Sequence, residues 1–230
     1  MSTVERLARY YAARAAEYED VYRIPERQGD IARLKARLCE LLADHHVLEV
    51  ACGTGYWTAA IAPCAASIVA TDINEEVLAI ARQKPVPAGR VRFLRDDAYD
   101  LTAVGGGFSA GFAGFWWSHV PRSRLKAFLE RFHARLAPGA LVVFADNVYI
   151  EGVSHPTVRV DGEGNGYQRR RLSSCATYEV LKNYPDEAEL REVLAGLSAG
   201  LCYERSRYYW CLSYTVGGDH AQANEQGRPA

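Results

Sequence analysis

The sequence predicts an α/β fold in which a mostly parallel sheet is covered by helices on both faces. Short apolar runs typical of buried strands alternate with segments of helical periodicity between residues 45 and 147. The first of these runs, residues 45–51, leads directly into a glycine turn, and the second ends beside the acidic residue Asp72. Because parallel strands need a crossover connection, usually a helix, this alternation indicates a parallel sheet.

The other elements follow from periodicity and from the positions of glycine and proline. We expect helices over residues 4–22, 30–43, 56–62, 74–83, 121–136 and 186–196. We expect strands over residues 45–51, 67–71, 91–94, 108–114, 140–146, 168–173 and 177–182, and one long or two short strands over 202–216. Residues 152–166 are rich in glycine and have little periodicity, which predicts an exposed loop.

Composition limits the classes of protein that this chain can be. With 230 residues, 49% of them apolar, it can bury one sizeable core, so a single domain is expected. The net charge of −1 provides no general basic field for nucleic acid or for an anionic membrane. No apolar run is long enough to cross a bilayer, and residues 1–10 lack the apolar stretch of a secretion signal. We therefore expect no membrane partner and a cytoplasmic location.

The six cysteines are scattered without a Cys-x-x-Cys pair. This pattern argues against a disulfide framework and against a zinc site. We expect free thiols, as in a reducing cytoplasm, and no bound metal.

The glycine turn and the acid after the second strand predict a nucleotide-like ligand. Gly53 and Gly55 follow the first strand, and glycine lets the backbone turn sharply and approach a ligand closely. In open α/β sheets, ligands bind beyond the carboxyl ends of the strands. Asp72 stands at such an end, where a carboxylate can accept hydrogen bonds from both hydroxyls of a ribose. The alternative is a tight turn in which Asp72 only caps the next helix.

The turn departs from the dinucleotide fingerprint, which has a third glycine three residues after the second. Thr58 occupies that position, and the helix begins with the bulky residues Tyr56 and Trp57. Glu49, inside the preceding strand, is also out of place beside a phosphate. An acid there suits a ligand with a positive end, such as a sulfonium and its amino group.

These features resemble the class I S-adenosylmethionine-dependent methyltransferases, whose first motif is similar to residues 49–55. The resemblance implies a Rossmann-like fold with a mostly parallel seven-stranded sheet and S-adenosylmethionine as the cofactor. It implies that Asp72 binds the ribose and that Asp97 with the backbone of Ala98 binds the adenine, although Asp96 could be the matching acid instead. The full set of cofactor-binding residues that it implies is Tyr11, Tyr18, Glu49, Ala51, Gly53, Gly55, Trp57, Asp72, Ile73, Asp97, Ala98 and Phe115.

The same resemblance divides the chain. Residues 1–216 form one methyltransferase domain, with an N-terminal helical lid region at 1–44, a cofactor-binding half at 45–147 and a substrate-binding half at 148–216. The lid interpretation rests on Tyr11 and Tyr18, which could fold over the cofactor and exclude water, or could simply pack as a helix face. Residues 217–230 are polar and contain glycine, which predicts a disordered tail.

Residues after the fourth strand are candidates for the site of the methyl acceptor. Trp116 can form an apolar wall that excludes solvent. His119, just before Pro121, could hydrogen-bond an acceptor oxygen or take a proton as the catalytic base. The alternative is that His119 only packs at the start of the following helix.

Two cationic side chains in the C-terminal third of the chain, Arg170 and Lys182, suggest an anionic substrate. Strand alternation over residues 168–173 and 177–182 places Arg170 and Lys182 on faces that also carry apolar side chains. A cation on a covered face needs a partner, and a bound anion is one candidate. Arg169 and Arg171 fall on the opposite face, where solvent is expected.

These segments also resemble a narrower group, the small-molecule phosphonate O-methyltransferases. Matching patches are Tyr10-Tyr11 with Glu17-Tyr18, residues 53–58, residues 116–121, and Arg169-Arg170 with Lys182. The resemblance implies that Trp116, His119, Arg170 and Lys182 bind a small anionic substrate, a phosphonate or a carboxylate, which is methylated on oxygen.

Other functions stay open at this point. One is N- or C-methylation of a neutral metabolite with His119 as the base. A second is a nicotinamide-dependent oxidoreductase, and a third is a non-catalytic cofactor-binding module. A nucleic-acid methyltransferase is disfavoured, because no Asn-Pro-Pro-aromatic sequence is present and residues 169–171 are the only basic stripe. The acceptor and the oligomeric state cannot be read from the sequence.

Overall fold

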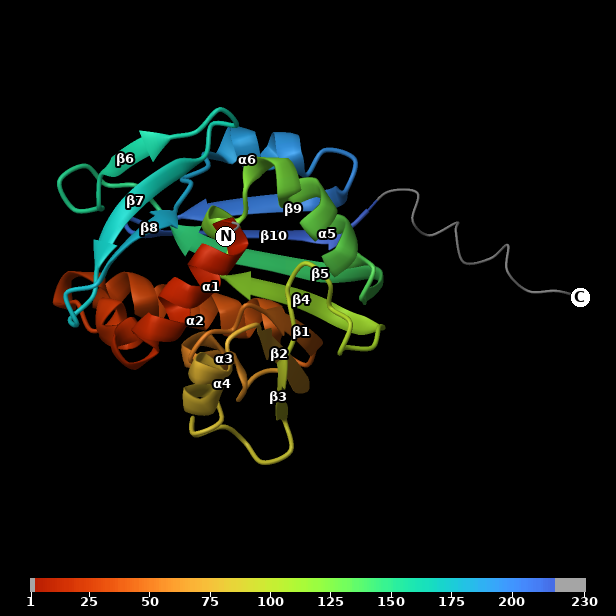
Figure 1. Cartoon of the computed structure of the whole chain (residues 1–230). Coiled ribbons are helices and arrows are strands. Elements are labelled where there is room, and N and C mark those ends of the chain that lie inside the picture. The colour runs from red at the N-terminus through yellow and green to blue at the C-terminus, as the bar shows by residue number, and fades with distance from the viewer. Residues whose placement is uncertain (1–2, 218–230) are drawn as a thin grey trace, which may run out of the picture.

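The computed structural model describes residues 3–217 and centres on a seven-stranded sheet (Figure 1). The strand order is β3-β2-β1-β4-β5-β10-β9. The first five strands in this order are parallel, and β10 and β9 form an antiparallel hairpin against β5. The strands are β1 (His46–Val50), β2 (Ser67–Asp72), β3 (Val91–Arg95), β4 (Phe108–Gly114), β5 (Leu136–Asn147), β9 (Ser198–Arg205) and β10 (Tyr209–Val216). The predicted mostly parallel, seven-stranded sheet is confirmed.

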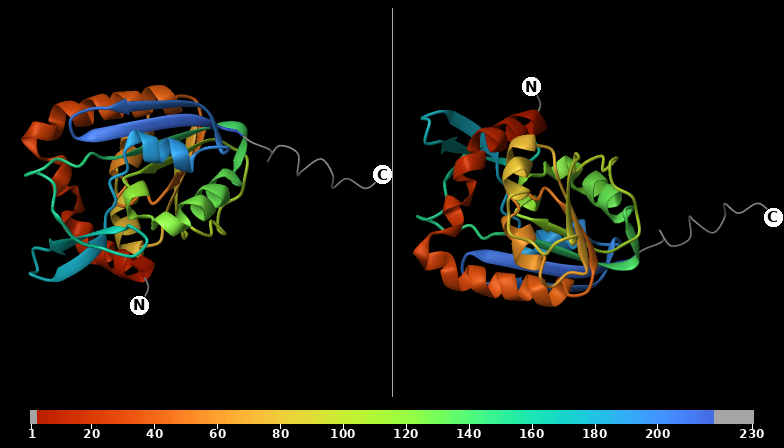
Figure 2. Two further views of the ribbon diagram at one scale, coloured as in Figure 1. Left: turned by 90° about the horizontal axis from the view of Figure 1, so that it is seen from above. Right: turned by 90° about the horizontal axis from the view of Figure 1, so that it is seen from below.

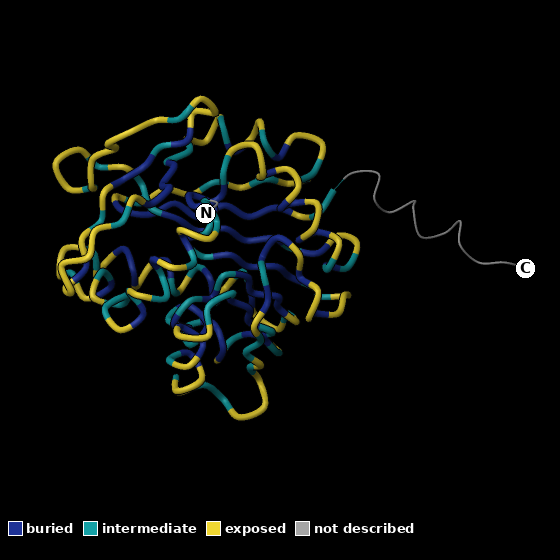
Figure 3. Tube along the Cα trace, viewed as in Figure 1, coloured by how far each residue is buried: buried dark blue, intermediate teal, exposed yellow. Residues whose placement is uncertain are grey.

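Helices cover both faces of this sheet (Figure 2). One face packs against α2 (Gln28–Leu42), α3 (Tyr56–Ile61) and α4 (Glu75–Ala81), and the other against α5 (Leu125–His133) and α6 (Glu187–Val193). Successive side chains of a strand point to opposite faces, so Val47 of β1 enters the first core and Leu48 enters the second. The central strands are consequently buried along their length, while loops carry most of the exposed positions (Figure 3).

A second, three-stranded antiparallel sheet lies beside α1 (Thr3–Arg14). It consists of β6 (Thr157–Val160), β7 (Gly166–Arg171) and β8 (Thr177–Leu181). Leu7 and Tyr10 of α1 form a small apolar cluster with Val180 of β8. The expectation that residues 152–166 are only an exposed loop is wrong, because β6 lies within them and pairs with β7. Its four residues are all exposed, so no apolar alternation marks the strand in the sequence.

The N-terminal segment is not one continuous helix, as periodicity predicted. After α1 it continues as two 3-10 helices, η1 (Ala15–Tyr22) and η2 (Pro25–Arg27). Tertiary contacts override helix propensity here. Glu17 accepts a hydrogen bond from the backbone of Ser173, and Glu19 reaches Thr54. The segment therefore touches both the small sheet and the turn after β1.

Two further expectations need correction. The helix predicted over 121–136 is shorter, because a 3-10 turn at Arg122–Arg124 precedes α5 and β5 already begins at Leu136.

Cys39 and Cys64 are joined as a disulfide, with 5.5 Å between their Cα atoms, although all cysteines were expected to be free. Folding brings these two residues together from positions 25 apart, and sequence spacing alone does not show such proximity.

No helix among the described residues is long and apolar enough to cross a membrane. The tail predicted at 217–230 lies outside the described residues except for Gly217.

The contact between β4 and α5 allows a test of the core. A Cβ added at Gly111 would lie 2.6 Å from Cζ of the fully buried Phe132. We expect Gly111→Ala to destabilise the protein by about 1–3 kcal/mol, because overpacking a dense core forces side chains to shift. Thermal unfolding should show a midpoint lowered by roughly 2–4 °C per kcal/mol. Gly105→Ala is the control, since nothing lies within 4 Å of its added Cβ. Equal midpoints for the two variants would contradict this packing.

Candidate functional site

The turn after β1 reverses direction through left-handed backbone conformations. Ala51, Gly53 and Gly55 have φ angles of 53°, 56° and 74°. A Cβ at Gly53 would meet only Tyr18, at 3.9 Å, so this glycine faces open space. A Cβ at Gly55 would lie 3.0 Å from Cβ of Ala81, so this glycine allows α4 to pack closely. The two glycines of the motif thus serve different purposes, one facing a cavity and one packing.

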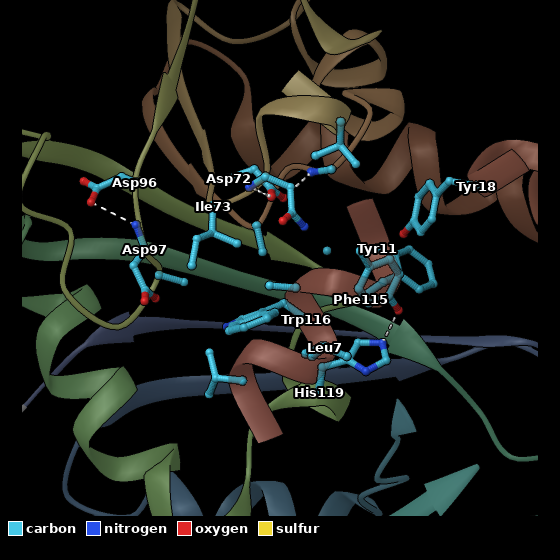
Figure 4. Close-up of a pocket in the computed structure, with 18 residues that line it drawn as sticks. Leu7, Tyr11, Tyr18, Asp72, Ile73, Asp96, Asp97, Phe115, Trp116 and His119 are labelled. Carbon is cyan, nitrogen blue, oxygen red and sulfur yellow. Dashed lines mark hydrogen bonds between the residues drawn. The ribbon is translucent and has the colours of Figure 1, made fainter. Parts of the chain in front are cut away.

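Asp72, at the end of β2, is fixed by the turn. Its Oδ2 accepts a hydrogen bond from the backbone of Gly53, and its Oδ1 accepts one from the backbone of Asn74, both at 2.9 Å. Burial raises the pKa of this carboxyl to about 6. The carboxylate therefore sits in one orientation at the wall of a cavity (Figure 4).

The two acids of the loop after β3, Asp96 and Asp97, differ in their hydrogen bonds. Asp96 accepts hydrogen bonds from the backbones of Asp97, Thr102 and Ala103 at 2.9, 3.2 and 2.8 Å, which uses both of its oxygens to hold the loop. Asp97 accepts one bond through Oδ1, from the backbone of Tyr99 at 2.9 Å. Both acids line the cavity, but only Asp97 keeps a carboxylate oxygen for another partner among the described contacts. The geometry favours Asp97 as the acid that meets a ligand.

These elements, together with α1 and the end of β4, enclose the first cavity, in which Asp97 lies at one end and Tyr18 and His119 lie at the other (Figure 4). The first cavity is lined by Val4, Leu7, Ala8, Tyr11, Tyr18, Ala51, Gly53, Asp72, Ile73, Asn74, Val77, Asp96, Asp97, Ala98, Gly114, Phe115, Trp116 and His119. Nine of the twelve residues expected at the cofactor are in this set, and Glu49, Gly55 and Trp57 are not.

Gly55 packs against α4, as described above, and the other two residues, Trp57 and Glu49, are buried outside the lining of the first cavity. Trp57 stacks on Phe115 with 5.3 Å between ring centroids and donates its Nε1–H to Tyr22 at 3.0 Å. Glu49 is buried in β1, and its Oε2 has no hydrogen-bond partner among the described residues. Burial raises the pKa of Glu49 to about 8. The carboxyl of Glu49 is thus uncharged at neutral pH in the ligand-free protein, in the strand that leads into the glycine turn.

Of α1, sequence reasoning named only Tyr11 and missed Val4, Leu7 and Ala8, which also line the first cavity. No motif marks these residues, although the amphipathic pattern of the helix could have done so. It also missed that Phe115 has a φ of 61°. Left-handed backbone at a non-glycine residue costs energy and clusters at functional sites. Ala51 shares this property, so two adjacent strand ends carry strained backbone at the cavity wall.

A second cavity adjoins the first and shares Tyr11, Tyr18, Phe115 and His119 with it. Its lining includes three arginines, Arg14, Arg27 and Arg170, together with Lys182 and His155. None of the described residues that line it is an aspartate or a glutamate. Trp116, expected in the acceptor site, lines the first cavity and not the second.

His119 stands between the two cavities. Its Nδ1 lies 2.7 Å from the carbonyl oxygen of Leu181, which can only accept, so Nδ1 carries the hydrogen. Its Nε2 therefore accepts the hydroxyl hydrogen of Tyr11, at 2.7 Å. Burial, reinforced by the charge of Lys182, lowers the pKa of His119 to about 3. The imidazole is neutral at physiological pH and presents a lone pair.

The two predicted cations differ in what they contact. Lys182 is buried and donates to Oδ1 of Asp146 at 2.9 Å and to Oγ of Ser118 at 2.6 Å. Arg170 donates to Oε1 of Gln168 at 2.6 Å, while its buried Nε has no partner among the described residues. The strand alternation is confirmed, since the flanking Arg169 and Arg171 are exposed. Arg170 is the cation with a spare donor at the second cavity.

Comparisons with known proteins agree with this geometry. Residues 47–139 match a family model described as a methyltransferase domain. The structure is similar to that of DhpI in complex with S-adenosylhomocysteine (SAH), with a TM-score of 0.78 and 28% identity over 94% of this chain and 98% of that one. A complex of DhpI with SAM and HEP gives a TM-score of 0.76 and 28% identity, covering 92% and 97%. The chain thus carries a methyltransferase domain, and its fold is that of the class I S-adenosylmethionine-dependent methyltransferases.

Curated relatives match this methyltransferase over shorter stretches. The O-methyltransferase cnsE of Penicillium expansum is 28% identical over 172 residues, which are 67% of this chain and 61% of that protein. A demethylmenaquinone methyltransferase of Clavibacter sepedonicus is 33% identical over 107 residues, 46% of this chain. In that match the chain spans 42% of the relative's length.

The first cavity of the methyltransferase fits S-adenosylmethionine. Gly53 leaves room for a close approach, and Asp72 and Asp97 supply carboxylate oxygens. Ile73, Phe115 and Trp116 supply apolar walls for the nucleoside. The orphaned Oε2 of Glu49 lies under the turn, where a positively charged ligand group would favour its ionised form.

The buried Glu49 predicts a pH dependence of stability. A carboxyl whose folded-state pKa is raised to about 8 stabilises the fold below its ordinary pKa and loses that contribution as pH rises toward 8. We expect the ligand-free parent to lose stability relative to Glu49→Gln on the order of 1 kcal/mol per pH unit over this window. Thermal unfolding in matched buffers measures the difference. Glu192→Gln, at an exposed position, should follow the parent, and a pH-independent difference for Glu49→Gln would contradict the buried neutral carboxyl.

Asp72 predicts a defect in cofactor affinity. If its carboxylate accepts hydrogen bonds from the ribose, Asp72→Ala should weaken the binding of S-adenosylhomocysteine roughly tenfold to a hundredfold, because hydrogen bonds to charged groups contribute about 1.5–3 kcal/mol. Isothermal titration calorimetry measures this loss. Asp100→Ala changes the same charge at an exposed position outside the first cavity and should bind as the parent does. Unchanged affinity in Asp72→Ala would place the sugar elsewhere.

Proposed function

We propose that this methyltransferase acts on a small acid and places the methyl group on one oxygen of a phosphonate or a carboxylate. The observation that carries the proposal is the second cavity. It adjoins the first at His119, it is lined by arginines, and its described lining residues include no acid. The DhpI complex with SAM and HEP and the name of cnsE as an O-methyltransferase support the same class of reaction.

In this proposal the first cavity holds the cofactor. Asp72 binds the ribose hydroxyls, Asp97 and the backbone of Ala98 bind the adenine edge, and Gly53 lies against the amino-acid part. S-adenosylmethionine, when bound, supplies a methyl group on a positively charged sulfur that a nucleophile can displace. The protein's task is then to align the acceptor oxygen and to exclude water.

Arg170 binds the acid in this scheme. Its unpartnered Nε–H is buried beside the second cavity, where a charge-assisted hydrogen bond to an anionic oxygen is strong. Lys182 acts differently from the simple clamp that the resemblance implied. Its hydrogen bonds go to Asp146 and Ser118, and its charge helps to lower the pKa of His119. Lys182 is thus a positioning residue for His119.

His119 accepts a proton or a hydrogen bond in this scheme. Because it is neutral and its Nδ1–H is held by Leu181, its Nε2 can only accept. A singly protonated phosphonate can donate its hydroxyl hydrogen to Nε2 in place of Tyr11, while its ionised oxygen forms the new bond to the methyl carbon as the bond from that carbon to sulfur breaks. A carboxylate needs no base, because its oxygen is already ionised. A fully ionised oxygen, by contrast, is better bound by Arg170.

The N-terminal segment covers the site. Tyr11 and Tyr18 line both cavities. Glu17 ties this segment to Ser173 of the small sheet at 3.1 Å, and Glu19 ties it to Lys84 at 2.8 Å. We propose that the segment is a lid that excludes water during transfer and must loosen for product release.

The lone pair of His119 also favours a second candidate, N- or C-methylation of a neutral metabolite with His119 as the base. The three arginines of the second cavity count against it, because a neutral acceptor would leave them without a counter-charge. A nicotinamide oxidoreductase is contradicted by the methyltransferase family match.

Arg170 gives a direct test of the anionic acceptor. We expect the parent to convert methylphosphonate or a longer alkylphosphonate to its monomethyl ester, detected by mass spectrometry. Arg170→Gln should lower kcat/KM for the acid roughly tenfold to a hundredfold, since a charged hydrogen bond is lost. Its affinity for S-adenosylhomocysteine should not change, because Arg170 does not line the first cavity.

The matched control is Arg169→Gln, the neighbouring arginine on the exposed face of β7, which should behave as the parent. Equal acceptor kinetics in Arg170→Gln and Arg169→Gln would remove Arg170 from the acceptor site. Absence of ester from every phosphonate and carboxylate tried, with efficient methylation of a neutral amine, would replace the proposal by the second candidate.

A further inference from the structure

The second cavity extends beyond the part that Arg170 serves. Its lining also includes Arg27, the last residue of η2, together with Tyr208 and with Tyr209, which begins β10. Tyr22 and Ile24 of the N-terminal segment complete this part of the wall. None of these residues belongs to a motif, and the methyl transfer described above uses none of them.

The hydroxyl hydrogen of Tyr209 has no acceptor. The residue is 3% exposed and its hydroxyl is buried, and its neighbour Arg27 carries only donors, so the O–H finds no acceptor among the described residues. A buried polar group without a partner costs about 1–3 kcal/mol, so such groups are rare in folded proteins. The cavity that Tyr209 lines is the place from which a ligand could supply the missing partner.

Arg27 is a cation without a counter-charge. None of the ion pairs of residues 3–217 includes it. Its guanidinium lies 5.5 Å from the centre of the Tyr208 ring, and the stacked ring orients it without neutralising it. An arginine and a free hydroxyl at one wall are the donors that bind a carboxylate or a phosphate.

This group is separate from the one around Arg170. Arg170 belongs to β7 of the small sheet and donates to Gln168 of the same strand. Arg27 belongs to η2 and lies against Tyr208, the residue before β10 of the main sheet. The two arginines therefore stand on different elements and contact different residues, and they provide two positive regions in the lining of one cavity.

We infer that the acceptor is a two-ended acid, whose reacting end binds at Arg170 and whose second anionic group binds Arg27 and the hydroxyl of Tyr209. This inference rests on the proposed function and extends it to the substrate class. The second anion contributes binding energy at a distance from the reacting oxygen, and such remote contacts also fix the orientation of the substrate. Specificity for two-ended acids over simple phosphonates follows.

The experiment compares matched probes on the full chain saturated with S-adenosylhomocysteine. A series of ω-phosphonocarboxylates of increasing chain length is titrated by calorimetry beside alkylphosphonates of the same length, which lack the carboxylate. We expect one length to bind at least roughly tenfold more tightly than its alkyl match, as a charged hydrogen-bonded contact predicts. Arg27→Gln should abolish this preference and leave alkylphosphonate affinity unchanged.

Two further variants complete the design. Tyr209→Phe removes only the hydroxyl and should reduce the preference without lowering thermal stability, because the O–H has no acceptor in the described structure. Arg23→Gln, at an exposed arginine of the same segment that pairs with Asp20, should keep the full preference. Equal affinity of the parent for both probes at every length, or a preference that survives in Arg27→Gln, overturns the inference and leaves the proposed function intact. Failure of the parent to bind either class of probe overturns both.

Discussion

A buried ion pair between Lys182 and Asp146 joins the two sheets of this methyltransferase. Lys182 directly follows β8 of the small sheet, and Asp146 belongs to β5 of the main sheet; their side chains are 4% and 0% exposed. Ser118 bonds to both partners, through its hydroxyl to Lys182 and through its backbone N–H to Asp146. Removing one member of such a pair typically costs about 3–5 kcal/mol, because the other charge is left uncompensated away from water. The small sheet is thereby held in one position against the main sheet.

The position of His119 depends on this ion pair. Leu181, whose carbonyl accepts the Nδ1–H of His119, is the residue immediately before Lys182. The charge of Lys182 adds to burial in keeping His119 unprotonated, and the free lone pair then receives the hydroxyl of Tyr11. A continuous set of contacts runs from the interior of the main sheet, through Lys182 and His119, to the N-terminal segment above the cavities. The orientation and the protonation state of His119 thus depend on the ion pair between Lys182 and Asp146.

The sequence predicted those parts of the site that depend on local pattern. The glycine turn and Asp72 lie where a strand, a turn and an acid at the next strand end were expected, because parallel strands bring their carboxyl ends to one edge. Strand alternation separated Arg170 from Arg169 correctly, since a period of two needs no tertiary information. The partner of Lys182 could not be predicted, because Asp146 is 36 residues away and only the packing of the two sheets in the folded chain brings it near. The disulfide between Cys39 and Cys64 was not predicted, because it too depends on long-range proximity. The strand β6 was not predicted, because all its residues are exposed and no apolar pattern marks it.

Charge explains why the second cavity suits the proposed methylation of an acid. Asp146 already compensates Lys182, so the uncompensated charge of the second cavity comes from Arg14, Arg27 and Arg170. A cationic cofactor in the adjoining cavity adds to this positive field, and an acid is the ligand that relieves it. Transfer of the methyl group neutralises one positive and one negative charge together. In the proposed O-methylation, the resulting ester has one anionic oxygen fewer for Arg170 to bind, so the reaction itself weakens the contact that recognises the substrate and favours release of the product.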